Sequence, residues 1–183
     1  MSETEKSKVQ IRSRPALGDR PAIERNGIAI KAMTEGRVIQ VLSKVSDGDV
    51  AADIAERLPD HLPLAIRALA PGQWLLVGEQ ACSDADMDAL CHALQPTAEV
   101  VDQTHGRVRI SVKGPSVERM LAKGTAVDLA HVAFPVGHAT TTLFGHIAAH
   151  ITRTDTDTFE LLVLRSFAES FWDDLDLMSR EFA

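Results

Sequence analysis

The histidines are the residues of this chain whose spacing most readily suggests chemistry. His146 and His150 lie four residues apart, and at that spacing two side chains on one helix can bind the same zinc ion. Apolar residues at positions 147, 149 and 151 alternate with them, which predicts a strand instead. Four residues along a strand span ~13 Å, too far for two bonds of ~2 Å to one zinc ion. We therefore predict no metal site and expect both histidines at the surface or in an interface.

Sequence patterns for nucleophiles and cofactor loops are missing as well. No Gly-x-Ser-x-Gly elbow occurs, and Ser166 and Ser170 stand where they can cap the last predicted helix. The chain has neither the glycine-rich fingerprint of dinucleotide-binding folds nor a phosphate-binding P-loop. We therefore assign no catalytic, cofactor-binding or metal-binding residue to this chain.

Basic residues follow one face of the clearest predicted strand, residues 107–113. Its alternate positions are valine and isoleucine, and the opposite face carries Arg107, Arg109 and Lys113. Such a face is either the solvated side of an edge strand, where charge prevents aggregation, or a surface that docks onto an acidic partner. Trp172, on the last predicted helix, packs in the core or in a buried interface. We take Arg107, Arg109, Lys113 and Trp172 as candidates for partner contact.

The last predicted helix, residues 167–182, has one apolar and one acidic side. Its apolar stripe is formed by Phe167, Phe171, Leu175, Met178 and Phe182. Its polar side carries Asp173, Asp174 and Asp176. We interpret these carboxylates as a solvated face, with contact to a partner as the alternative.

Bulk composition limits the classes of function. The 183 residues have a net charge of −7 and are 45% apolar, enough for one core. An acidic chain argues against nucleic acid, whose phosphates need clustered basic residues. No apolar run approaches the ~20 residues that span a bilayer, and no apolar core follows the charged N-terminus as in a signal peptide. With only Cys82 and Cys91, nine residues apart, free thiols and a cytoplasmic location are expected.

A duplication organises the predicted elements. Residues 36–38 and 106–108 both read Gly-Arg-Val, and each copy continues through a helix to an apolar strand and a second helix. We predict an α+β fold with mixed sheets, in which a strand–helix–strand–helix unit is duplicated with pseudo-two-fold symmetry. Residues 1–25 are predicted to be a flexible arm, and residues 26–183 a single domain.

Hydrophobic periodicity and the residues that typically begin or end helices and turns place the individual elements. A strand pair is expected at residues 27–33 and 38–42, joined by a turn at Glu35 and Gly36. Helices are expected at residues 50–58, 83–94, 116–123 and 167–182. The other strands are expected at residues 73–78, 98–102, 107–113, 139–144, 147–153 and 158–164.

The second half of the chain resembles the gamma subunit of heterotetrameric sarcosine oxidase. The matching residues are 72–78, 102–109, 114–116, 121–124, 127–129, 134–137 and 159–172. The resemblance covers residues 70–183 well and the first 70 residues weakly. It implies a fold like the folate-binding domain of the glycine-cleavage aminomethyltransferases.

The resemblance also implies partners and cofactors. Enzymes of this type demethylate sarcosine to glycine at a flavin, reduce oxygen to hydrogen peroxide, and pass the methyl carbon to tetrahydrofolate. In that family the FAD, FMN and NAD are held by the large subunits and zinc by the smallest one. This chain would accordingly be a non-catalytic structural subunit, assembled with alpha, beta and delta subunits and holding no cofactor itself. A related N-methyl amino acid dehydrogenase is a close variant of this hypothesis.

One segment departs from the aminomethyltransferase pattern. Those enzymes carry a Gly-Ile-x-Asp-Asp stretch whose carboxylate works beside folate, and residues 145–149 of this chain are in the equivalent place. Both acids are replaced, by Ala148 and Ala149, and a methyl group can neither transfer a proton nor stabilise a cationic amine. The alternatives are a stand-alone folate-binding or aminomethyltransferase-like protein, which would bind tetrahydrofolate, and an adaptor unrelated to amine oxidation.

Overall fold

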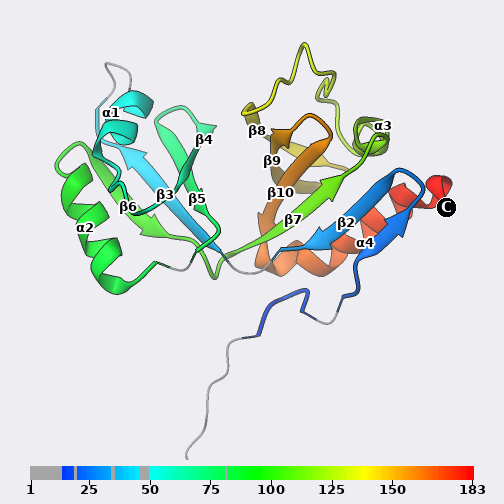
Figure 1. Cartoon of the computed structure of the whole chain (residues 1–183), viewed down its shortest axis with the longest axis horizontal. Helices are drawn as coiled ribbons and strands as arrows, with labels where there is room; N and C mark the ends of the chain where they lie inside the picture. The colour runs from blue at the N-terminus through cyan, green and yellow to red at the C-terminus, as the bar shows by residue number, and fades with distance from the viewer. Residues whose placement is uncertain (1–13, 19, 34–35, 46–49, 81) are drawn as a thin grey trace, which may run out of the picture.

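Two antiparallel sheets with helices on their outer sides form the fold (Figure 1). The computed structural model describes residues 14–18, 20–33, 36–45, 50–80 and 82–183. The expected α+β class is confirmed. The expectation of mixed sheets is wrong, because every strand pair among the described residues is antiparallel.

The four-stranded sheet belongs to the first copy of the duplication. Its strands have the order β4-β5-β3-β6, and helices α1 and α2 cover its outer face (Figure 1). The chain order β-α-β-β-α-β is that of a ferredoxin-like unit. The elements are β3 (Arg37–Ser43), α1 (Val50–Arg57), β4 (Ala65–Ala70), β5 (Gln73–Gly78), α2 (Asp84–Leu94) and β6 (Ala98–Asp102).

The six-stranded sheet contains the second copy. Its order is β1-β2-β7-β10-β9-β8. Its strands are β1 (Ile23–Arg25), β2 (Ile28–Ala32), β7 (Arg107–Lys113), β8 (Ala139–Phe144), β9 (Ile147–Asp155) and β10 (Thr158–Leu164). Its helices are α3 (Val117–Leu121) and α4 (Ala168–Ser179), and short 3-10 turns at Arg165–Phe167 and Arg180–Phe182 flank α4.

The two sheets share a strand order, and a strand from the N-terminal region completes the second. The order β9-β10-β7-β2 repeats the order β4-β5-β3-β6, with β2 in the place of the fourth strand. The expected pairing of residues 27–33 with residues 38–42 is therefore wrong: β2 pairs with β7, and β3 pairs with β5 and β6. The expectation also missed β4, so the first copy contains one more strand than predicted.

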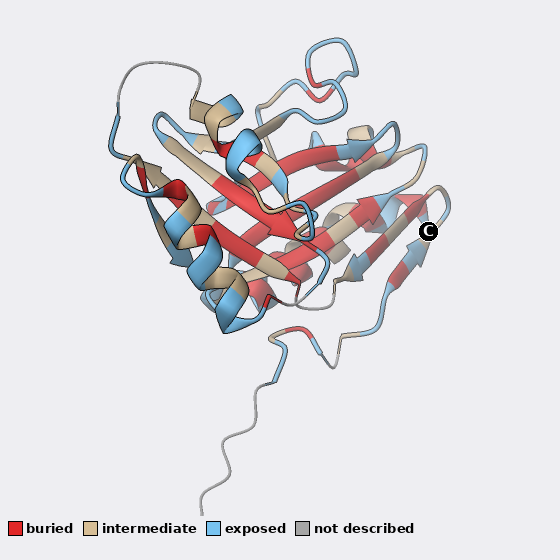
Figure 2. Ribbon diagram, turned by 60° about the vertical axis from the view of Figure 1, so that its left-hand side comes forward, coloured by how far each residue is buried: buried red, intermediate tan, exposed pale blue. Residues whose placement is uncertain are grey.

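Buried residues follow the strands of both sheets (Figure 2). The apolar ones form two outer cores and a smaller cluster between the sheets. The larger outer core joins α3 and α4 to the six-stranded sheet, and the other joins α1 and α2 to the four-stranded sheet. The cluster between the sheets consists of Val38, Leu75, Val77 and Leu162. Both faces of the central strands are consequently buried.

The ends of the helices follow the sequence closely. Ser83 caps α2 through a capping box with Asp86, and Asp86 holds a pKa of about 2 because Ser83 and then His61 donate hydrogen bonds to its carboxylate. On α4, Phe171 and Leu175 are fully buried, as the predicted stripe requires. Phe167 differs from the expectation, since it lies in the 3-10 turn before α4 and is 46% exposed.

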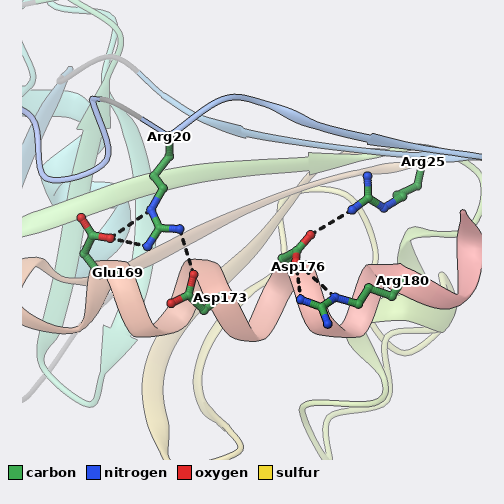
Figure 3. A network of polar contacts seen from close by, with 6 residues as sticks. All are labelled: Arg20, Arg25, Glu169, Asp173, Asp176 and Arg180. Carbon is green, nitrogen blue, oxygen red and sulfur yellow. Dashed lines mark hydrogen bonds and ion pairs between the residues drawn. The ribbon is translucent and has the colours of Figure 1, made fainter.

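The N-terminal segment, defined here as residues 14–18 and 20–25, lies along α4 (Figure 3). The Arg20 guanidinium binds Glu169 at 2.5 Å and Asp173 at 3.0 Å, and Arg25 binds Asp176 at 3.0 Å. Two of the three carboxylates that we assigned to a solvated face are therefore paired within the chain. The domain boundary placed after residue 25 falls inside the six-stranded sheet, because Ile23–Arg25 is β1. Residues 1–13 of the expected arm lie outside the described residues.

A buried arginine holds the connector between α3 and β8. Arg153 is fully buried on β9, and its guanidinium donates hydrogen bonds to the carbonyl oxygens of Phe134, Leu129 and Thr156. It also lies 4.4 Å from the centre of the Phe159 ring, a cation–π contact. One side chain thus binds two carbonyl oxygens of the connector, at Leu129 and Phe134, and one of the turn between β9 and β10, at Thr156.

Replacing Phe171 with alanine should lower the free energy of unfolding by about 3–5 kcal/mol. The ring is fully buried and packs edge-to-face on Phe144, with 5.6 Å between ring centres. Urea unfolding followed by circular dichroism measures the change. Leu177→Ala is the matched control, because Leu177 is on the same helix and 60% exposed, and it should change stability by less than about 0.5 kcal/mol. Equal effects for both variants would contradict this packing of α4.

Candidate functional site

A buried carboxylate joins the two sheets. Glu160, on β10, faces the four-stranded sheet and is only 4% exposed. Its Oε1 accepts a hydrogen bond of 2.6 Å from Arg109 Nε on β7, and its Oε2 accepts one of 2.9 Å from Arg67 on β4. Arg109 further donates to the carbonyl oxygen of Gly78 at 3.2 Å and to Glu79 at 2.5 Å. We call Arg67, Arg109 and Glu160 the seam triad.

The seam triad is charged, and its pKa shifts show why. Burial raises the pKa of Glu160, but the hydrogen bonds from Arg109 and Arg67 outweigh it and leave the pKa below its ordinary value. Burial likewise lowers the pKa of Arg109, and Glu160 and Glu79 together raise it. Each ion is therefore stabilised by its partners.

Glycine is needed at the start of β3 for the sheets to approach. A Cβ atom at Gly36 would overlap the Gly78 carbonyl oxygen and the Arg109 guanidinium. The first Gly-Arg-Val motif thus has a packing explanation, because its glycine lies against Arg109 of the seam triad.

Further polar groups between the sheets lack partners. His150 is 1% exposed inside the chain, so the expectation that it lies at the surface or in an interface is wrong, whereas His146 is exposed as expected. Its Nε2 is 2.9 Å from the Ala68 carbonyl oxygen, which can only accept, so this nitrogen carries the proton. Burial and then the nearby Arg67 and Arg107 lower the pKa of the imidazole, against the Ala68 hydrogen bond. His150 Nδ1 and the Thr152 hydroxyl are buried and have no hydrogen-bond partner among the described residues.

The structure separates the four candidates for partner contact. Strand β7 pairs with β2 on one side and β10 on the other, so the edge-strand explanation of its basic face is wrong. Arg109 is buried in the seam triad, and Trp172 is 3% exposed in the larger core. Arg107 is half-buried and Lys113 is exposed. Within this chain, Lys113 is the candidate most free to contact a partner.

The turn expected to resemble the aminomethyltransferase motif joins β8 to β9. Gly145 has a φ of +58°, a conformation that favours glycine. Ala148 is exposed and Ala149 is buried. Because both residues are alanine, neither position supplies a carboxylate. In the described part of the chain, no group of three or more His, Cys, Asp or Glu side chains could hold a metal ion. No described helix is long and apolar enough to cross a membrane.

Sequence reasoning missed the acidic member of the seam triad. Residues 159–163 read Phe-Glu-Leu-Leu-Val, and one acid inside an apolar strand indicates a buried partner of opposite charge. Arg109 was noticed as part of a basic face, but alternation alone could not show that this face is covered by a second sheet.

This arrangement defines a class of α+β domain with two antiparallel sheets, similar to the folate-binding domain of aminomethyltransferases. The chain belongs to the sarcosine oxidase, gamma subunit family, whose sequence profile matches residues 49–181. A curated relative, sarcosine oxidase subunit gamma of Corynebacterium sp. (strain U-96), is 30% identical over 123 residues. The match covers 67% of this chain and 56% of that relative, so it spans little more than half of the relative's length.

Solved structures support the same fold. A chain of the heterotetrameric sarcosine oxidase from Corynebacterium sp. U-96, in complex with pyrrole 2-carboxylate, superposes with a TM-score of 0.79 at 22% identity, covering 93% of this chain and 97% of that one. The glycine cleavage system aminomethyltransferase T from Bartonella henselae gives a TM-score of 0.60 at 16% identity, over 82% of this chain and 46% of that one. The expected likeness to both folds is confirmed.

Replacing Glu160 with glutamine should destabilise the protein by roughly 3–5 kcal/mol at pH 7, because it leaves Arg109 and Arg67 buried without their shared counter-charge. Urea unfolding measures the loss. Glu79→Gln is the matched control: it removes a charge from the same arginine, but its side chain is 68% exposed.

The difference between wild type and Glu160→Gln should depend on pH with a defined sign. Since folding lowers the pKa of Glu160, its contribution is complete above the ordinary value of 4.5 and is lost as the pH falls through the folded pKa. Unfolding curves between pH 7 and pH 3 should therefore converge. A constant difference would show that folding does not lower the pKa of Glu160.

Proposed function

We propose that this chain is a non-catalytic assembly subunit of a heterotetrameric, flavin-dependent sarcosine oxidase. Its partners would be the alpha, beta and delta subunits, and the whole complex would convert sarcosine to glycine, hydrogen peroxide and methylene-tetrahydrofolate. Membership of the gamma subunit family is the observation that carries the proposal. The FAD, FMN, NAD and tetrahydrofolate would be bound by the partners.

The chemistry of the described residues supports a non-catalytic role. The charged groups that the fold buries all bind groups of this chain: Arg67 and Arg109 bind Glu160, and Arg109 also binds Glu79. Arg153 binds Glu118 and backbone carbonyl oxygens. The turn at residues 145–149 offers two alanines where a related enzyme would use carboxylates. A proton-transfer group in reach of a bound substrate is what general acid–base catalysis needs, and neither place supplies one.

Purification of the tagged full chain from its native host, grown on sarcosine, tests the proposal. We expect a yellow complex of several subunits that consumes oxygen when sarcosine is added. Native mass spectrometry gives its composition, and the absorbance spectrum reports flavin. A colourless chain without partners would contradict the proposal, and titration with tetrahydrofolate would then test the folate-binding alternative. A yellow complex that does not oxidise sarcosine but oxidises another N-methyl amino acid would support the subunit role and show that the proposed substrate is wrong.

Lys113→Glu should weaken this assembly and leave the chain folded. Lys113 is exposed at the end of β7, so charge reversal costs little within the chain but opposes an acidic partner surface. Co-purification yield and the melting temperature of the isolated variant measure the two effects. Lys44→Glu is the control on the other sheet: Lys44 is an exposed lysine just past β3, and because it pairs with Glu99 its reversal should lower the melting temperature and leave co-purification unchanged. Unchanged co-purification would remove Lys113 from the interface.

A further inference from the structure

A cavity of about 320 Å³ lies where the starts of β3 and β7 meet the end of β2. Residues 15–18, 20 and 22 of the N-terminal segment line one side of it, and Figure 1 shows this segment as the dark blue stretch below the two sheets. The volume is at the lower end of the range for small-molecule sites. The cavity is no part of the features on which the proposed function rests.

The charged groups in its wall are all cationic. Arg20, Lys31, Arg107 and Arg109 line the cavity, and the described lining contains no aspartate or glutamate. Arg20 and Arg109 already bind carboxylates of the chain. Lys31 and Arg107 form no ion pair with any described residue, in a protein whose net charge is −7. Two cations therefore remain available to an anion.

Arg107 has the clearest need of a partner. Its Nε is buried and has no hydrogen-bond partner among the described residues. Burial lowers the pKa of its guanidinium, and no nearby acid offsets that shift. An unpaired buried donor on a charged group is costly. A carboxylate would remove the cost, because it accepts two parallel hydrogen bonds from one guanidinium.

The rest of the wall is mainly aliphatic and would hold the remainder of such a ligand. Leu17 is 3% exposed and lines the cavity together with Met33 and Val108. We propose that this cavity binds a small organic acid, with its carboxylate on Arg107 and Lys31 and its apolar body against these aliphatic side chains. A ligand with one anionic group and one apolar body is expected because the lining has a cationic part and an apolar part.

Methyl NMR of the full chain, with labelled methionine, tests the proposal directly. Met33 lines the cavity, and Met87 on α2 reports a site outside it. The probes are cyclohexanecarboxylate, its neutral amide and cyclohexylmethylamine, which share a shape and differ in charge. We expect the carboxylate to shift the Met33 methyl signal and leave the Met87 signal unchanged. The amide should bind at least about tenfold more weakly than the carboxylate, and the amine should not bind. Equal binding of all three, or no shift at Met33, would overturn the proposal.

Paired substitutions localise the anion. Arg107→Gln should weaken carboxylate binding by about tenfold or more, whereas Lys113→Gln, on the same strand but outside the cavity lining, should change it less than about twofold. Should Arg107→Gln fail to fold, Lys31→Gln replaces it, with a smaller loss expected. Unchanged binding in the folded variant would overturn the assignment.

The same titration on the purified native complex separates a free ligand from a carboxylate of another subunit. A small-molecule site should bind the carboxylate probe in both the isolated chain and the complex. A cavity filled by an acidic side chain of a partner would bind the probe only in the isolated chain, and that result would overturn the proposal. Failure of the chain to form a flavin complex would contradict the proposed function and leave the binding result unaffected.

Discussion

One buried carboxylate constrains the way in which the two sheets can face each other. Glu160 binds arginines from two strands of different sheets, and a lone buried ion of either sign would be strongly unfavourable. The sheets must therefore keep a spacing and a register in which all three charges meet. The apolar cluster of Val38, Leu75, Val77 and Leu162 lies in the same layer and is non-directional. The ions fix the geometry, whereas the apolar contacts supply most of the driving force.

A strand from the N-terminal region that completes the second copy's sheet makes a second constraint. Strand β2 comes before the first copy in the sequence and yet occupies the fourth position of the second copy's sheet. The chain then passes through Gly36 into β3 of the other sheet. The first copy completes its four-stranded sheet with its own strands, whereas the second copy's sheet needs β2 from the N-terminal region. The six-stranded sheet therefore contains chain from both ends of the sequence, and the two sheets bury the inner faces of their central strands against each other.

Local patterns in the sequence predicted which helices and strands form better than they predicted which strands pair with each other. The alternation in residues 107–113 identified β7 correctly, and Ser83 identified the start of α2. The partners of β2 were wrong, because a nearby turn favours a hairpin and nothing in residues 27–33 encodes a partner 80 residues away. The basic face of β7 was misread for a similar reason: charge normally indicates solvent. Only the acid within the apolar strand Thr158–Leu164 pointed to a charged layer inside the protein.

The charged layer also bears on what this domain can do. A general acid or base must be able to gain or lose a proton near the working pH, and its hydrogen bonds must be free to change as it does so. Glu160 is held ionised by two arginines, and His150 Nε2–H donates a hydrogen bond to the Ala68 carbonyl oxygen, so both side chains are held by the fold. Moving a proton onto Glu160 would weaken the contact between the sheets. Glu160 and His150, two groups that catalysis could use, are thus held in place by the fold.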